Sequence, residues 1–276
     1  MRVPADVVGK VEWHGCDFRG HAGAPEDRLF LLMRGENEYR VLCFSQKPEF
    51  EFVVETEHSD LCFSQPLRDG ILLADSRQPR LALNARVYDF AGNILREFAL
   101  GDGIEELQTT ASGDIWASYF DEGVFGRTIG AAGLVRFDGQ GVPTYEFQPS
   151  EGLDRISDCY ALNVESAETV WFYYYTSFLL VRLRNEAING FWHTDLEGAR
   201  AFAVSGNRVV MHAGRYRHDW RLLQLNENAT VENLGPVEFV DPDGTRLSDY
   251  LARARGPLIW FVRNSMVYRV DIREHW

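Results

Sequence analysis

The 276-residue sequence lacks most features that assign a function directly. Its four cysteines, Cys16, Cys43, Cys62 and Cys159, include no C-x-x-C pair, and disulfide frameworks belong to much smaller domains. We therefore expect single buried thiols in a reducing cytoplasm. Positive charge is also scarce: 28 Lys and Arg against 41 Asp and Glu give a net charge of −13. This balance argues against nucleic acid or an anionic membrane surface as a partner, because both are bound through cations.

Long apolar runs and catalytic motifs are missing as well. The N-terminus has no apolar stretch of a secretory signal. The most apolar segment, 169–183, contains Arg182 and is shorter than the ~20 residues of a membrane-spanning helix, so it predicts a β-hairpin. There is no G-x-S-x-G, no H-E-x-x-H, no phosphate-binding loop and no dinucleotide fingerprint. We expect a cytoplasmic protein without membrane association, and no cofactor is evident.

What the sequence does contain is a repeat. Short polar turns recur at Gly15, Ser59, Gly103, Gly152, Gly198 and Gly244. Their spacings are 44, 44, 49, 46 and 46 residues, and the step from the last turn through the C-terminus to the first spans 47 residues. Six similar steps therefore account for the whole chain, which indicates a repeat architecture.

Each unit contains four short apolar or alternating segments separated by turns. In the third unit these are 104–110, 115–120, 133–138 and 142–147. The pattern predicts an all-β fold, a six-bladed β-propeller with four-stranded blades, because a β-sandwich does not give six units of equal length. The predicted single domain covers 1–276, with blades near 15–58, 59–102, 103–151, 152–197, 198–243 and 244–276 plus 1–14.

The two ends of the chain predict how the ring closes. The last unit offers strands over 245–253, 258–262 and 266–272 and lacks a fourth, whereas the N-terminal segment around 5–14 is a strand without a unit. Pairing them removes two exposed strand edges. Within the blades, Trp116, Trp171 and Trp260 occupy equivalent second-strand positions, where we expect them to be buried.

The segment TTASGDIWASYFDEG at 109–123 resembles the propeller repeats of bacterial two-component sensors. Its aliphatic-Trp pair recurs at Val170-Trp171 and Ile259-Trp260. In blade number the chain is also similar to the gluconolactonase-type six-bladed hydrolases. That resemblance implies a divalent metal ion in the central channel, held by Glu, Asp and Asn side chains. Asn163 and Asn207 lie near predicted inner strands, but without that family's surrounding motif.

The period also predicts a site at the channel mouth, because equivalent positions of a closed ring lie at equal radius. The position two residues past each turn is acidic in the first, third and fourth units and basic in the last two. In the second unit this position is Leu61, and Asp60 lies one residue before it. The predicted ligand-binding residues are Asp17, Asp60, Glu105, Asp154, Arg200 and Arg246. Converging charges of this kind bind a metal ion, a sugar or a carboxylate. The alternative is that they are exposed turn residues that pair across blades.

A glycine-rich loop over 121–133 is longer than the equivalent connections, and Phe125 and Arg127 are its predicted site residues. It acts either as a lid over the mouth or as an insertion packed on the rim.

The predicted fold and site are compatible with two functions. The first is a binding propeller that holds a small molecule or a protein at the channel mouth and top-face loops. The alternative is a gluconolactonase-like hydrolase with an acidic, metal-assisted site, and the sequence leaves open whether the chain is an enzyme.

Overall fold

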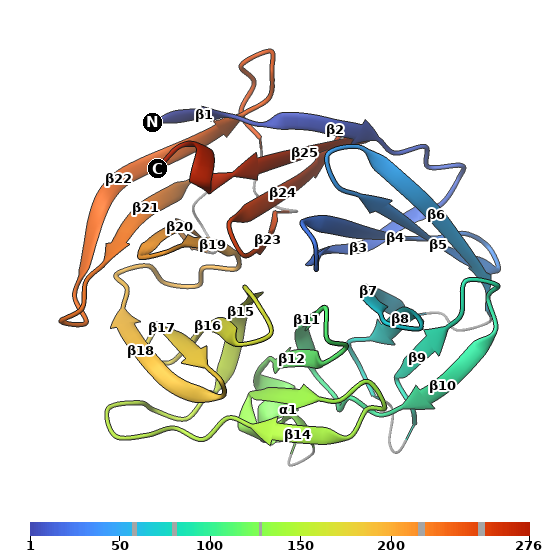
Figure 1. Cartoon of the computed structure of the whole chain (residues 1–276), viewed down its shortest axis with the longest axis horizontal. Helices are drawn as coiled ribbons and strands as arrows, with labels where there is room; N and C mark the ends of the chain where they lie inside the picture. The colour runs from blue at the N-terminus through green and yellow to red at the C-terminus, as the bar shows by residue number, and fades with distance from the viewer. Residues whose placement is uncertain (57–59, 79–81, 127–128, 215–218, 248–251) are drawn as a thin grey trace. The chain divides into compact units, whose positions relative to one another are not determined.

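The computed structural model describes residues 1–56, 60–78, 82–126, 129–214, 219–247 and 252–276. These residues form six sheets of at least four strands each, joined in sequence order as the blades of a β-propeller (Figure 1). The prediction of an all-β, six-bladed propeller is thus confirmed. Contacts divide the chain into two compact units: a first unit, Trp13–Cys159, and a second unit, Met1–Glu12 with Tyr160–Trp276. The assignment of 1–276 to one domain stays a prediction.

The first unit carries three antiparallel sheets whose strands follow one another along the chain. The first sheet consists of β3 (Asp17–Ala24), β4 (Arg28–Arg34), β5 (Glu38–Phe44) and β6 (Pro48–Glu55). The second consists of β7 (Leu61–Leu67), β8 (Gly70–Asp75), β9 (Ala85–Tyr88) and β10 (Ile94–Phe98). The third consists of β11 (Ile104–Thr109), β12 (Ile115–Tyr119), β13 (Leu134–Phe137) and β14 (Pro143–Glu146). The four strands expected in this third blade are confirmed.

The other three sheets follow after the third. One consists of β15 (Asp158–Val164), which begins at the end of the first unit, β16 (Thr169–Tyr175), β17 (Leu179–Arg184) and β18 (Ala187–His193). The next contains β19 (Phe202–Ser205), β20 (Arg208–His212), β21 (Trp220–Leu225) and β22 (Val231–Val240). The last contains β23 (Arg253–Arg255), β24 (Leu258–Arg263) and β25 (Met266–Asp271). The predicted hairpin over 169–183 is the antiparallel pair β16–β17.

The N-terminal segment closes the last sheet, as predicted. Strand β2 (Asp6–Lys10) pairs antiparallel with β25, beside which it lies in Figure 1. A second N-terminal strand was not expected: β1 (Arg2–Pro4) pairs in parallel with β22 and makes that blade five-stranded. The buried alternate residues Val3 and Ala5 are the sequence signal for it. Pro4, which has no backbone N–H, suits a strand at the sheet edge.

The inner strand of the last blade differs from its expected position. The sequence predicted it over 245–253, but β23 is the short segment Arg253–Arg255, and Arg246 instead forms an isolated bridge with Val240 at the end of β22. The turn at Gly256-Pro257 sets the end of β23 and leads directly into β24. Residues 245–247 therefore lie in the connection after β22, although the repeat alone assigns them to a strand, and residues 248–251 lie outside the described part.

Burial agrees with the expected strand pattern. Trp116, Trp171 and Trp260 are at most 2% exposed, as predicted. All four cysteines are free thiols, two of them buried. The helices of the described part are α1 (Asp121–Phe125) and the 3-10 helices η1 (Ile129–Ala132) and η3 (Ile272–Glu274). Among the described residues, no helix has the length and hydropathy needed to cross a membrane.

Candidate functional site

The inner strands of the first unit, β3, β7 and β11, contact one another and share an irregularity near their starts. Each has a β-bulge against its neighbour, at Arg19, Cys62 and Glu105, respectively. These three residues are 43 and 43 positions apart, so they are structurally equivalent. Bulges are over-represented next to functional sites because they redirect side chains. Counting two residues past each predicted turn selected Glu105 but not Arg19 or Cys62. The bulged positions are defined by the pairing of the strands, which the distance from a turn does not reveal.

Charged groups gather around two of the bulged residues. Arg19 Nε donates a hydrogen bond to the Leu61 carbonyl oxygen at 3.2 Å. Burial raises the pKa of the Asp75 carboxyl, with Asp60 adding to the rise and Arg86 and Arg19 opposing it. Burial also raises the pKa of the Cys62 thiol to about 11, so this thiol is protonated near neutral pH and is a poor nucleophile.

The predicted acidic residues of the first three units lie at or beside these inner strands. Asp17 is the exposed first residue of β3, Asp60 is exposed just before β7, and Glu105 is half-buried in β11. Burial raises the pKa of the neighbouring Cys159 thiol, and the charges of Glu106 and Glu105 contribute to the rise. Glu105 is thus part of an acidic environment at the start of β11.

The remaining predicted residues lie outside strands. Asp154, Arg200 and Arg246 are exposed and lie 4, 2 and 7 residues before the inner strands β15, β19 and β23, respectively. The charge of Arg246 is among the causes that lower the pKa of Glu238 in β22, after the hydrogen bond from Arg2. Counting from the turns therefore selects inner-strand residues in the first half of the chain and connecting residues in the second. The convergence of all six residues on one channel mouth stays a prediction.

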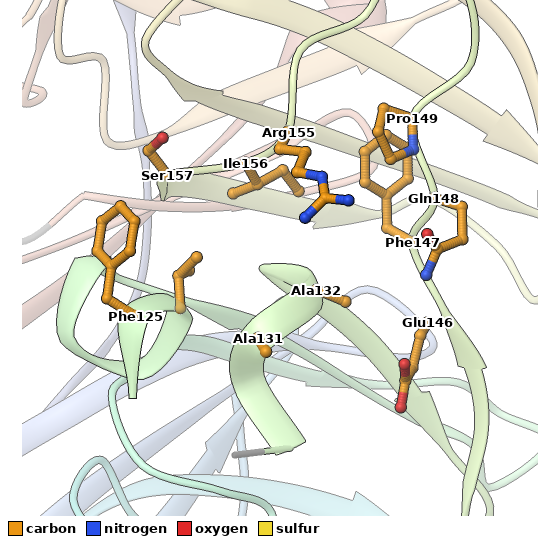
Figure 2. A pocket seen from close by; sticks show the side chains of 11 residues that line it. Phe125, Ala131, Ala132, Glu146, Phe147, Gln148, Pro149, Arg155, Ile156 and Ser157 are labelled. Atoms are coloured by element: carbon orange, nitrogen blue, oxygen red, sulfur yellow. The ribbon is translucent and has the colours of Figure 1, made fainter. Parts of the chain in front are cut away.

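A pocket in the first unit lies on the third blade, between the 121–133 insertion and the linker that follows β14. Its volume is about 610 Å³ (Figure 2). We call it the rim pocket; it is lined by Val124, Phe125, Ala131, Ala132, Glu146, Phe147, Gln148, Pro149, Arg155, Ile156 and Ser157. Because Ile104 pairs with Tyr119, Ser118 with Leu134 and Val135 with Glu146, the insertion and the linker lie at the end of the sheet where β11 begins. The rim pocket and Glu105 therefore share one end of this blade.

Helix α1 forms one wall of the pocket and is fixed from two sides. The backbone N–H groups of Gly123 and Val124 donate to the Phe120 carbonyl oxygen at 3.0 and 3.1 Å. Arg77, in the connection after β8, makes an ion pair with Glu122, and its guanidinium carbon lies 5.0 Å from the Phe120 ring centroid. This contact orients α1, although an exposed ion pair adds only about 0–1 kcal/mol to stability.

The glycines of the insertion allow close packing. A Cβ on Gly130 would lie 2.6 Å from Cδ1 of the Tyr119 ring, and one on Gly133 would collide with the side chain of Ile156. Gly133 also has φ = +76°, a left-handed conformation that glycine adopts most easily. The described part of the insertion is thus packed against the blade and the linker. Its role as a lid stays a prediction, and Arg127 lies outside the described residues.

The pocket is lined by both apolar and polar side chains. Within the described part of the chain, the side chains of Glu146, Gln148, Arg155 and Ser157 make no hydrogen bond or ion pair. Figure 2 shows the Arg155 guanidinium directed toward the η1 turn, with Phe125 on the α1 side. Phe125 is 69% exposed, which is unusual for a phenylalanine. An exposed aromatic ring and unpaired polar groups at a cavity are features of a ligand site.

The sequence reading found Phe125 but missed the other side of this pocket. The length of the linker 147–157, which carries Arg155, could have indicated it, because this linker is longer than the other connections between blades of the first unit. The described residues contain no group of three or more His, Cys, Asp or Glu side chains arranged to hold a metal ion.

Comparisons with known proteins support the fold. A profile of the YxzG family matches residues 144–270, which include the linker side of the rim pocket. No curated protein matches the chain. Among solved structures, a catalytically inactive virginiamycin B lyase from Staphylococcus aureus, crystallised with quinupristin, has 12% identity and a TM-score of 0.51, with 94% of this chain and 96% of that chain covered. Kluyveromyces lactis Hsv2 has 10% identity and a TM-score of 0.54, with 93% and 75% covered.

At these identities the two structures share a propeller fold with this chain. The resemblance of its repeats to those of two-component sensors stays a prediction.

Proposed function

We propose that this chain is a binding β-propeller whose ligand site is the rim pocket. The observation that carries the proposal is a cavity of about 610 Å³ that combines apolar and polar walls with an exposed phenylalanine. Four of its polar side chains make no hydrogen bond or ion pair within the described residues. Small-molecule sites commonly have about 300–1,000 Å³ of volume, mostly apolar walls and a few polar groups. The propeller fold is compatible with a binding role, because rigid blades hold the loops at the ends of their strands in fixed positions.

Gln148, Arg155 and Ser157 each present a hydrogen-bond donor that a ligand in the pocket can use. Because the walls are fixed by backbone hydrogen bonds and glycine contacts, little conformational entropy is lost when a ligand enters. A ligand that covers Phe125 also removes apolar surface from water. The small entropy loss and the burial of Phe125 both favour binding only if the ligand fills the space between α1 and the linker.

The experiment is a thermal-shift screen of the full chain against a diverse set of small molecules. A ligand at 100 times its Kd stabilises the folded state by about 2.7 kcal/mol, which raises Tm measurably. The variant Ala132→Trp places an indole in the pocket and should abolish the shifts. The matched control is Ala187→Trp, an exposed position on β18 in the second unit, which should retain them. If every hit shifts the Ala132→Trp variant as much as the wild type, the pocket is not the ligand site.

The hydrolase is the second candidate, and the cluster at the bulged strands favours it. Asp60 and Asp75 lie close enough for the charge of one to raise the pKa of the other, and a carboxyl of raised pKa is suited to general acid catalysis. In this alternative a divalent metal ion at the channel mouth assists hydrolysis of a lactone or sugar-like substrate. Lactone hydrolysis with and without added Ca²⁺ or Zn²⁺ tests it: Asp60→Asn and Asp75→Asn should each reduce the rate, and an unchanged rate in both would exclude these residues.

A further inference from the structure

We infer that the rim pocket selects an apolar monocarboxylate, with the carboxylate bound by Arg155 and the apolar body packed against Phe125. This inference rests on the proposed function and adds the chemical class of the ligand. Three features of the described pocket residues carry it: an arginine without an acidic partner among them, a single opposing carboxylate, and an apolar surface that continues to an exposed ring.

Arg155 differs from most arginines of its own unit. Ion pairs with Asp or Glu are made by Arg28, Arg40, Arg77, Arg86, Arg96 and Arg136. Arg155 makes none within the described part of the chain, although the protein has 41 acidic and 28 basic residues. Its guanidinium is directed into the pocket (Figure 2), where a planar carboxylate would accept two parallel hydrogen bonds. Gln148 and Ser157 offer further donors on the same linker.

Glu146 limits the charge that the ligand can carry. The described lining residues include one guanidinium and one carboxylate, so a monoanion pairs with Arg155 and meets a single negative group. A phosphate monoester carries about −1.5 to −2 charges at pH 7, so its second charge would be opposed by Glu146 and by the net charge of −13. The pocket therefore favours a carboxylate over a phosphate.

The apolar part of the ligand follows from the rest of the surface. The linker contributes Phe147, Pro149 and Ile156, and the insertion contributes Val124 and the exposed Phe125. An aromatic or branched body would bury both sides at once, and a ring would stack on Phe125 in an offset or edge-to-face geometry. Acetate, which lacks such a body, would have only the arginine contact.

Isothermal titration of the full chain with four probes tests the inference. Phenylacetate has both parts of the expected ligand, phenylacetamide is its uncharged isostere, phenyl phosphate is a dianion with the same ring, and acetate has no ring. We expect phenylacetate to bind at least about tenfold more tightly than each of the other three, the range that a charge-assisted hydrogen bond produces.

Two variants assign this preference to residues. Arg155→Gln should weaken phenylacetate binding at least about tenfold and leave phenylacetamide unchanged. Arg184→Gln, at an exposed arginine of β17, is the matched control and should change neither. Glu146→Gln should reduce the discrimination against phenyl phosphate, because it removes the opposing charge.

The outcomes separate this inference from the proposed function. Equal binding of phenylacetate and phenylacetamide that Ala132→Trp abolishes would overturn the carboxylate assignment and leave the pocket as the ligand site. Binding of phenylacetate that survives both Ala132→Trp and Arg155→Gln would place the ligand elsewhere and overturn both. No binding of phenylacetate to the wild type would overturn the monocarboxylate inference. The thermal-shift screen with Ala132→Trp would then test separately whether the rim pocket binds another small molecule.

Discussion

Strand β12 and the rim pocket belong to the same blade, yet they use their side chains in opposite ways. Every residue of β12 is buried, and the Tyr119 hydroxyl donates to the Leu100 carbonyl oxygen. In the pocket, by contrast, Phe125 is exposed and Arg155 has no acidic partner among the described residues. The strand is optimised for packing, whereas the pocket retains exposed apolar surface and unpaired charge that a ligand can use. Substitutions in the two regions should therefore separate stability from binding.

The largest effect is expected at the centre of β12. Trp116 is 2% exposed and packs on Tyr145, with ring centroids 5.7 Å apart. Trp116→Ala should reduce the free energy of unfolding by about 3–5 kcal/mol, because it leaves a large cavity. Urea denaturation measures the loss, and Trp116→Phe should lose less. A change below 1 kcal/mol would contradict the tight packing of Trp116 in β12.

Gly133 joins the two regions, because it ends the insertion and contacts Ile156 in the pocket wall. Gly133→Ala should destabilise by about 2–3 kcal/mol, the sum of an unfavourable positive φ and a steric clash. Gly92→Ala is the matched control: φ is +86° there, but the nearest atom to the new Cβ would be 3.8 Å away, so only about 1–2 kcal/mol should be lost. Equal losses in both variants would show that the Ile156 contact is not tight.

The hairpin turn before β12 provides a pH-dependent test. Burial acts to raise the pKa of Asp114, but hydrogen bonds from Ser112 and Arg136 outweigh it, and the pKa is lowered overall. A carboxyl with a lowered folded-state pKa adds stability that is fully present above its unfolded value of about 3.9 and is lost as the pH falls through the folded value. Asp114→Ala should cost about 1–2 kcal/mol at pH 7. The difference from wild type should shrink in urea titrations at pH 3 and below; a constant difference would refute the ionic contribution.

The smallest effect on stability is expected in the pocket. Arg155→Gln removes an exposed side chain that has no carboxylate partner in the part of the chain that the structure describes, and it should change the free energy of unfolding by less than about 0.5 kcal/mol. The same substitution should weaken phenylacetate binding, so stability and binding separate at this position. A loss of more than 1 kcal/mol in urea denaturation would mean that Arg155 belongs to the packed part of the blade.

The fold was predictable from the sequence wherever the local pattern is strong. Gly15, Ser59 and Gly103, the turn positions predicted from the sequence, are one or two residues before β3, β7 and β11 in the chain. The count from them therefore reached the inner strands. After Gly152, Gly198 and Gly244 the inner strands begin 6, 4 and 9 residues later. Connections vary in length because they lie outside the hydrogen-bonded sheets, and sequence spacing alone does not reveal this variation.

The candidate site was predictable only in part. Phe125 was found because it belongs to a long insertion, and Glu105 because it follows a turn directly. Arg19 and Cys62 become equivalent to Glu105 only through β-bulges, which are defined by strand pairing. Glu146 carries no local signal, since a glutamate near a strand end is an ordinary surface residue, and Arg155 is marked only by the length of its linker.

By itself the sequence determined the number of blades, the strands of most sheets and the closure by β2, because period-two alternation and turn residues act over a few neighbouring positions. Only the tertiary structure decided where the pocket lies. The insertion 121–133 and the linker 147–157 meet because the strands of one antiparallel sheet bring their ends together, and because Gly133 allows Ile156 to approach. Whether Arg155 pairs with an acidic residue likewise depends on which acids the fold places near it, a property of packed neighbours that no local segment contains.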